Sequence, residues 1–230
     1  MTFSLLVRDP ETGTIGGAAA TGSYCVGGWV LRGRFDSGLS ASQGAAPSTF
    51  WGDEALDRML AGAGAPETLE AVISADGNRE WRQLTVLDLQ GNTAAHSGDR
   101  NGSWHGHITR PGLVAAGNIL AGPHVLERLE EAYRSTFSGM AEQLIAALHA
   151  AHEAGGDRRG LKSAALLVLA PDRPPMSLRI DMSPAPLDDL ARLAAACQDR
   201  GVPGNYAHWT DAVPVPTDPF RADPDILSLE

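Results

Sequence analysis

The sequence predicts an α+β fold in which two antiparallel β-sheets are stacked between layers of helices. Segments with strand-like and helix-like patterns follow one another in blocks: strands, two helices, strands, two helices, strands and one helix. This order suits two sheets whose outer faces are covered by helices. With 230 residues, the chain can bury a sizeable core and is most simply one domain, or one domain with an appendage.

The N-terminal stretch predicts a β-hairpin. Within residues 2–8, side chains two apart share a face of the strand, so Thr2 and Ser4 point the same way. Residues 9–13 have the composition of a turn. The return arm, 14–20, is almost all small, which would let another layer or a substrate approach the backbone closely. The alternating apolar positions are Phe3, Leu5 and Val7.

The same patterns predict the remaining elements. The run 164–170 is continuously apolar and should therefore be a central strand. Other strands are expected over 26–34, 37–43, 81–89, 93–96 and 178–181, with a further strand pair between 104 and 116. Helices are expected with Asp53 in the first turn, from Pro66, from Gly122-Pro123, over 140–154 and over 187–200.

The last thirty residues differ from the rest of the chain. Residues 201–230 hold five of the fifteen prolines and show no periodicity. We therefore expect a domain of residues 1–200, followed by an extended proline-rich tail over 201–230. Trp209 and Phe220 could anchor the tail on the domain or on a neighbouring subunit, and we expect a homo-oligomer, most simply a homodimer.

Composition excludes several classes of function. The net charge of −10 argues against nucleic-acid binding, which requires clustered positive charge. No apolar run approaches the length that a membrane span requires, and we expect no signal peptide, because the first residues show no charged n-region followed by an apolar h-region. The two cysteines, Cys25 and Cys197, have neither CxxC spacing nor a disulfide-rich setting. We expect a cytoplasmic protein.

Thr2 is the first candidate functional residue because it stands directly behind Met1. If Met1 is removed, Thr2 carries both a hydroxyl nucleophile and a free α-amine, whose reference pKa of about 7.7–8.0 allows it to act as a base. A peptide bond to Met1 would deprive Thr2 of that amine. The alternative is an inert strand residue, since strands favour β-branched side chains.

Three ordered motifs carry a family resemblance: Thr2-Phe3-Ser4, the run GNIL at 117–120, and GGDRRG at 155–160 followed by SAALLV at 163–168. On these motifs, the chain resembles the bacterial family called domain of unknown function 1028, which is grouped with the N-terminal nucleophile (Ntn) hydrolases. The resemblance runs from Thr2 to about Arg192. It implies a four-layer αββα sandwich and amide-bond chemistry.

The resemblance also marks positions of interest and departures. Ser42-Gln43 lies where the family tends to have Thr-Gln, so Gln43 is a candidate polar group lining the site. The family usually has Ser where Thr21 stands and Gln where Lys162 stands, which leaves any role of those two positions open.

Four further residues are candidates for the site. Asn118 lies between a strand and a helix, and its amide could donate to an oxyanion; the alternative is a turn asparagine. Asp157 and Arg158 could bind a substrate amine or carboxylate, or could belong to a solvated loop. Ser163 enters the apolar strand, either as a site residue or as a packed hydroxyl.

The histidines offer an alternative chemistry. His105 and His107 share a strand face, and His149 and His152 lie three apart on a helix, but neither pair has a convincing third ligand nearby. We expect no metal and no cofactor.

The sequence therefore predicts an Ntn-type hydrolase that cleaves an amide or related acyl bond in a small polar substrate, with Thr2 as nucleophile. The alternatives are a non-catalytic small-ligand-binding or assembly protein on the same fold and a hydrolase that uses a histidine-bound metal.

Overall fold

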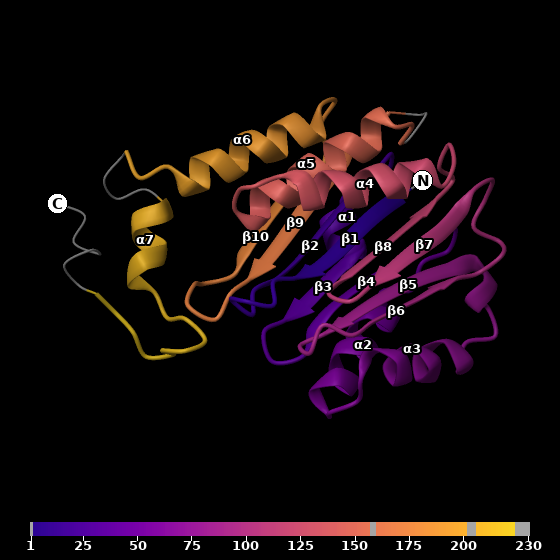
Figure 1. The fold of residues 1–230 in the computed structure, drawn as a ribbon, viewed down its shortest axis with the longest axis horizontal. Coiled ribbons are helices and arrows are strands. Elements are labelled where there is room, and N and C mark those ends of the chain that lie inside the picture. The colour runs from indigo at the N-terminus through magenta and orange to yellow at the C-terminus, as the bar shows by residue number, and fades with distance from the viewer. Residues whose placement is uncertain (1, 157–159, 202–205, 224–230) are drawn as a thin grey trace.

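The structure, a computed structural model, describes residues 2–156, 160–201 and 206–223. The described elements form a sandwich of two antiparallel sheets with helices on both outer faces (Figure 1). The α+β fold expected from the order of strands and helices is therefore confirmed.

The larger sheet contains six strands of the described chain, in the order β10-β9-β2-β1-β8-β7. At its centre lies the expected N-terminal hairpin, whose turn ends at Gly13 with a φ of 72°. β9 pairs with a strand on each side, as its continuous apolar sequence predicts. The strands are β1 (Thr2–Arg8), β2 (Ile15–Thr21), β7 (His105–Arg110), β8 (Leu113–Asn118), β9 (Ser163–Leu169) and β10 (Met176–Ile180).

The smaller sheet contains four strands of the described chain, in the order β3-β4-β5-β6. Its strands are β3 (Leu31–Arg34), β4 (Gly38–Gly44), β5 (Arg82–Asp88) and β6 (Thr93–Ser97). Gly38 permits the close pairing of β4 with β5, because its φ is 132° and an added Cβ would lie 2.3 Å from the carbonyl oxygen of Leu87.

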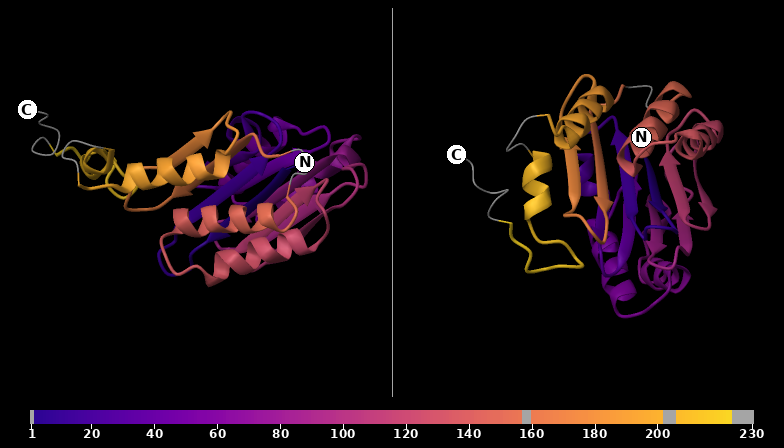
Figure 2. Two further views of the ribbon diagram at one scale, coloured as in Figure 1. Left: turned by 90° about the horizontal axis from the view of Figure 1, so that it is seen from above. Right: turned by 60° about the vertical axis from the view of Figure 1, so that its left-hand side comes forward.

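Helices cover the two outer faces separately (Figures 1 and 2). On the larger sheet lie α4 (His124–Ser135), α5 (Met140–Glu153) and α6 (Pro186–Gln198). On the smaller sheet lie α2 (Thr49–Leu60) and α3 (Ala65–Ser74), followed by the short 3-10 helix η1 (Arg79–Trp81). Each helical layer buries an apolar cluster against its sheet.

The space between the two sheets changes character along its length. At one end it is apolar, with Leu6, Leu39 and Leu87 fully buried in a common cluster. At the other end, where β1 begins, the inward-facing side chains are polar. This polar end is where a site can form, since buried polar groups otherwise carry a desolvation cost.

The start of the expected strand 26–34 is wrong. Residues Val26–Trp29 form the helical turn α1, and the strand begins only at Leu31. Gly27 and Gly28 have low strand preference. They also let the turn pack tightly, because a Cβ on Gly27 would lie 2.8 Å from the Cβ of Ala165. The first long helix also starts earlier than expected, at Thr49, because Trp51 and Gly52 are already buried.

The C-terminal segment is not extended throughout. Tyr206–Ala212 form helix α7, which lies beside the sandwich (Figure 2). The Arg200–Asp211 ion pair connects this helix to the residues after α6. Trp209 is 49% exposed and Phe220 is 92% exposed, so neither is buried by the chain itself.

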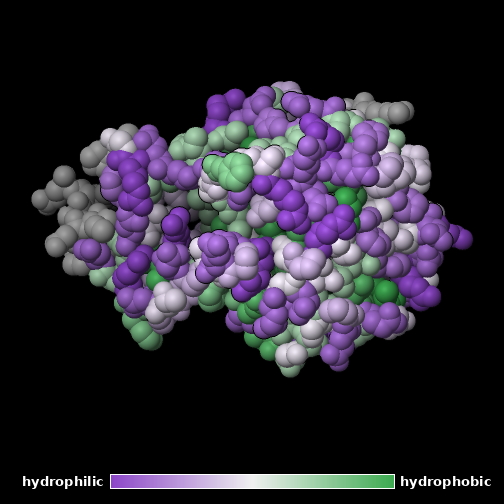
Figure 3. Space-filling view, in the orientation of Figure 1, coloured by the Kyte–Doolittle hydropathy of each residue, from purple (hydrophilic) through white to green (hydrophobic). Residues whose placement is uncertain are grey.

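Hydrophilic side chains cover most of the face shown in Figure 3, with apolar ones scattered among them. No helix among the described residues is both long and apolar enough to cross a membrane.

Candidate functional site between the two sheets

A row of polar side chains crosses the larger sheet at the end where the chain begins. Thr2 on β1 is the register partner of Thr21 on β2 and of Asn118 on β8. Thr21 is in turn the partner of Ser163 on β9. Directly paired residues project from the same face of a sheet. Because Phe3 is buried beneath the helices, this row faces the smaller sheet.

Two hydroxyls meet within this row. Thr2 Oγ1 lies 3.0 Å from Thr21 Oγ1, a hydrogen bond in which either oxygen can be the donor. Thr21 is buried, whereas Thr2 is only half-buried. Thr2 is therefore the more accessible of the two residues, and its hydroxyl is held in place by a neighbour on β2.

The hydroxyl of Ser163 has main-chain partners on both sides. It accepts a hydrogen bond from Val26 N at 3.1 Å and donates to the carbonyl oxygen of Ser23 at 2.8 Å. Ser163 is fully buried. These contacts fix the turn between β2 and α1, which is the packed-hydroxyl alternative considered for this residue.

The smaller sheet contributes two glutamines that face the row. Gln43 on β4 and Gln83 on β5 are register partners, and both are buried. Gln43 Nε2 lies 3.1 Å from Gln83 Oε1 and 3.5 Å from the carbonyl oxygen of Thr2. Asn118 Nδ2 donates to the same Gln83 Oε1 at 2.9 Å. Gln83 thus connects Gln43 with Asn118 across the interface between the sheets.

Gln83 was not among the residues predicted for the site. The alternation in β5 could have indicated it, because Gln83 and Thr85 share a face of the strand with the buried Leu87. A glutamine on the buried face of a strand implies hydrogen-bond partners inside the fold.

Two of the predicted site residues, Asp157 and Arg158, lie outside the described residues. The structure brings Thr2, Asn118 and Gln43 together, and it places Ser163 in the same row as Thr2.

Two residues beside the row have unusual backbone conformations. Among the described non-glycine residues, Cys25 and Ile119 have positive φ, at 61° and 57°. Ile119 directly follows Asn118, and Cys25 directly precedes Val26, whose N–H bonds to Ser163. Positive φ in a β-branched residue is a genuine outlier, and such strain tends to gather at functional sites.

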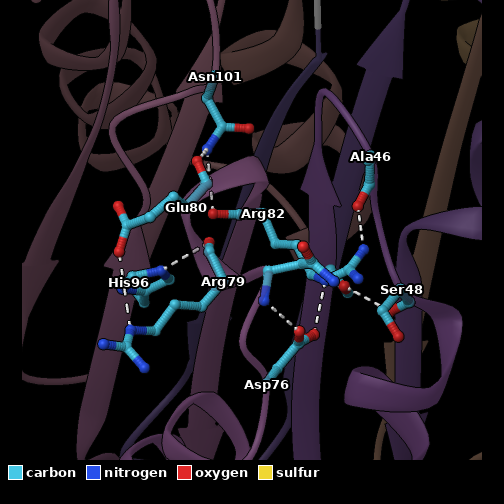
Figure 4. Close-up of polar contacts among 10 residues, drawn as sticks. Ala46, Ser48, Asp76, Arg79, Glu80, Arg82, His96 and Asn101 are labelled. Atoms are coloured by element: carbon cyan, nitrogen blue, oxygen red, sulfur yellow. Dashed lines mark hydrogen bonds and ion pairs between the residues drawn. The ribbon is translucent and has the colours of Figure 1, made fainter.

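A buried asparagine holds the rim of the site on the smaller sheet (Figure 4). Asn101 belongs to the loop between β6 and β7 and has no exposed surface. Its Nδ2 donates to the carbonyl oxygens of Gly98 at 2.7 Å and Arg82 at 3.1 Å, and its Oδ1 accepts from Ala45 N at 2.9 Å. The loop is thereby attached to the ends of β4 and β5, next to Gln43.

Arg82 and Asp76 form the other half of the arrangement in Figure 4. Arg82 Nε lies 2.7 Å from Asp76 Oδ2, with both side chains largely buried, and the Arg82 guanidinium also donates to the carbonyl oxygen of Ala46. Because these charges are satisfied within the fold, this cluster is structural.

The histidines are dispersed in the structure. His107 Nδ1 lies 3.0 Å from Ser97 Oγ, and His105 Nδ1 lies 3.3 Å from the carbonyl oxygen of Gly102. His149 Nε2 is 3.9 Å from Asp188 Oδ1 on α6. In the part of the chain that the structure describes, no three His, Cys, Asp or Glu side chains are grouped as metal ligands.

The arrangement offers the parts that acyl transfer requires. It has a half-buried hydroxyl at the start of a strand, a second hydroxyl that bonds to it, and side-chain amides that can donate hydrogen bonds.

Comparison with known proteins agrees with the fold. A crystal structure of protein SPO2555 from Silicibacter pomeroyi, described with the family model DUF1028, is 48% identical in sequence. The match covers 96% of this chain and 95% of that chain, with a TM-score of 0.90. No curated protein matches the chain.

The family comparison agrees with the family resemblance of the sequence. A model described as a family of unknown function, DUF1028, matches residues 2–190. The chain therefore belongs to the DUF1028 family.

Proposed function

We propose that this protein is an Ntn-type hydrolase that cleaves an amide or related acyl bond in a small polar substrate. Thr2 is the nucleophile once Met1 has been removed. Asn118 stabilises the developing oxyanion, and Gln43 is a polar residue that lines the site. Asp157 and Arg158 contribute to substrate binding in this proposal, and Ser163 supports the site by holding the turn between β2 and α1.

The contact between Thr2 and Thr21 carries the proposal. Thr2 Oγ1 lies 3.0 Å from the hydroxyl of the buried Thr21. This hydrogen bond orients Thr2 Oγ1, and the half-buried position of Thr2 lets a substrate approach. The same row contains Asn118 as the other register partner of Thr2.

The chemistry uses the two functional groups of one residue. Thr2 Oγ attacks the acyl carbon, and the Thr2 α-amine takes the hydroxyl proton. The amine then gives this proton to the leaving nitrogen as the carbon–nitrogen bond breaks, which leaves an ester on Thr2. Water attacks the ester, gives its proton to the α-amine, and Thr2 Oγ regains a proton as the acid leaves.

Asn118 is suited to the oxyanion role because its amide nitrogen carries two hydrogens. One is used in the bond to Gln83 Oε1 at 2.9 Å, and the other remains for an acyl oxygen. Removal of one oxyanion donor typically lowers turnover about 100- to 1000-fold.

The proposed compartment is the cytoplasm. Cys25 and Cys197 are both free thiols in the structure, which suits a reducing environment.

The first test is the state of the N-terminus. Intact mass and N-terminal sequencing of protein from its native host should show loss of Met1. A β-lactone acylating probe should then modify Thr2, located by peptide mapping, in the parent and in Thr2→Ser but not in Thr2→Ala. Thr109→Ala, which removes an exposed threonine on β7, is the matched control and should be labelled like the parent.

Two results would contradict the hydrolase proposal. One is complete retention of Met1 in the native host, and the other is equal labelling of Thr2→Ala and the parent. Either would favour the second candidate, a small-ligand-binding protein on the same fold. That candidate draws support from the buried amides of Gln43, Gln83 and Asn118, which form a polar wall without themselves being nucleophiles.

A further inference from the structure

We propose that Gln83 is the positioning residue of this site, because it determines which atom Asn118 presents to a bound acyl group. Gln83 has no exposed surface, and both ends of its side-chain amide already bond to groups of the protein. Its influence on the reaction must therefore pass through the side chains that it holds. The inference rests on the proposed function for its catalytic part, but the orientation itself can be measured independently.

The orientation of the Gln83 amide is determined by its surroundings. Its nitrogen lies 2.9 Å from the carbonyl oxygen of Gly117 and 3.3 Å from that of Gly106. Carbonyl oxygens only accept hydrogen bonds, so the group facing them must be the NH2. A reversed amide would place Gln83 Oε1 against two other oxygens.

This orientation fixes Gln83 Oε1 as the acceptor on the opposite side. Asn118 Nδ2 at 2.9 Å and Gln43 Nε2 at 3.1 Å both point to it and fill its two lone pairs. Neither amide can reverse without bringing a second oxygen against Gln83 Oε1. The direction set by the main chain at Gly117 is thus passed through Gln83 to both neighbours.

Gln43 shows that Gln83 imposes this direction. Gln43 Oε1 is buried without a hydrogen-bond partner among the described residues. A buried acceptor normally finds a donor. Here the oxygen is left unpaired because the Gln43 nitrogen is required by Gln83.

The orientation of Asn118 decides whether its side chain attracts or repels the negative charge that develops on an acyl oxygen. With Gln83 in place, Asn118 turns its NH2 group toward Gln83 Oε1, and one of its two hydrogens is not used in that bond. If Asn118 reversed, its carbonyl oxygen would take the place of this NH2 group and would repel an oxyanion. Gln83 therefore makes Asn118 a donor.

The test compares three variants. Gln83→Met keeps the approximate volume and removes every hydrogen bond, whereas Gln83→Glu keeps oxygen acceptors for Asn118 and Gln43. Gln90→Met changes an exposed glutamine just beyond the end of β5 and is the matched control. NMR assigns the side-chain amide of Asn118 by its disappearance in Asn118→Ser.

The first measurement is the solvent exchange rate of the Asn118 side-chain amide hydrogens. We expect this rate to rise at least tenfold in Gln83→Met and to stay within about twofold of the parent in Gln83→Glu and in Gln90→Met, since both leave Asn118 an acceptor. An unchanged rate in a folded Gln83→Met would overturn the proposal, whatever the enzyme does. If Gln83→Met does not fold, loss of protection in a folded Gln83→Glu would overturn it.

The second measurement is labelling of Thr2 by the β-lactone probe, resolved into a binding constant and a maximal rate. Gln83→Met should lower the maximal rate about 100-fold with little change in binding, as expected for a lost oxyanion donor. A normal maximal rate together with raised amide exchange would overturn the catalytic part. A parent that is never labelled would instead contradict the proposed function, and the exchange measurement would still decide the role of Gln83.

Discussion

Thr2 and Thr21 place their hydroxyl oxygens 3.0 Å apart across the central β1–β2 hairpin, and their backbones are register partners. The contact links the first residue of the described chain to the last residue of β2. Because Thr21 is buried and Thr2 is half-buried, Thr21 can orient the Thr2 hydroxyl without blocking access to it.

We predict that the hydroxyl of Thr21, and not its methyl group, matters for reactivity. Thr21→Val keeps the shape and removes the hydrogen bond, so labelling of Thr2 by an acylating probe should slow about five- to tenfold, which corresponds to roughly 1 kcal/mol. Thr21→Ser keeps the hydroxyl and should react within about twofold of the parent. Equal labelling rates of Thr2 in Thr21→Val and in the parent would show that the Thr21 hydroxyl has no role in the reactivity of Thr2.

Much of the fold followed from local sequence patterns. The alternation of Phe3, Leu5 and Val7 predicted β1, and all three are fully buried under the helices as expected. Helices α4 and α5 were predicted from their amphipathic spacing, and both form. These predictions are correct because the spacing of apolar residues within each element indicates which face of the element is buried.

The errors arise where distant residues determine the local structure. Gly27 and Gly28 weaken the strand next to Val26, but the hydrogen bond from Val26 N to Ser163, 137 residues later, cannot be read from the residues near Val26. Helix α7 similarly depends on contacts with residues outside its own short sequence, such as Arg200.

The site shows the same division between local and distant information. Thr2, Gln43 and Asn118 were predicted and are brought together. The role of Gln83 depends on how one sheet is stacked against the other, because its partners Gly117 and Asn118 belong to the other sheet. Single-strand periodicity indicates that Gln83 points inward but does not indicate what it meets.

A second prediction concerns the C-terminal segment and the expected homodimer. Phe220 and Trp209 are exposed on the isolated chain, and burial against a second copy would remove their apolar surface from water. We expect light scattering to give twice the mass of one chain for the parent, and one chain for the double variant Phe220→Ser with Trp209→Ser. Phe50→Ser, on α2 and 81% exposed, should remain dimeric. A monomeric parent would refute the dimer.

A third prediction follows from the pKa of His107. Partial desolvation of the ring and the neighbouring His96 lower this pKa below its ordinary value of 6.5. The folded state therefore binds the His107 proton less readily than the unfolded state, so this residue makes the free energy of unfolding decrease as the pH falls below about 6.5. The contribution of His107 to the free energy of unfolding is therefore fully present above pH 6.5, and it decreases as the pH falls from 6.5 to the lowered pKa of the folded state.

NMR titration of the His107 ring measures this directly. The pKa of His107 should lie below 6.5 in the parent and should move upward in His96→Gln, which removes the second of the two causes. His149→Gln, on α5, is the control and should leave it unchanged. A His107 pKa at or above 6.5 in the parent would contradict the prediction.

The strongest stability prediction concerns Asn101. Its buried side chain accepts a hydrogen bond from Ala45 N and donates to the carbonyl oxygens of Gly98 and Arg82. Asn101→Ala removes the donor of the Gly98 carbonyl oxygen and the acceptor of Ala45 N, whereas the Arg82 carbonyl oxygen keeps its hydrogen bond from Gly98 N at 3.0 Å. The free energy of unfolding should fall by about 1–3 kcal/mol. Asn78→Ala, at an exposed position before η1, should change it by less than about 0.5 kcal/mol.

Asn101→Asp separates the hydrogen-bonding pattern from the packing. The carboxylate has the same shape but faces carbonyl oxygens, so burial and these dipoles should raise its folded pKa above the reference of about 3.9. An acid whose pKa is raised by folding loses stability as the pH increases through that range. We expect urea denaturation to find the Asn101→Asp variant closest to the parent near pH 4 and clearly weaker at pH 7. If the deficit were the same at both pH values, the donor role of Asn101 Nδ2 would be wrong, and the rim of the site would be held by shape alone.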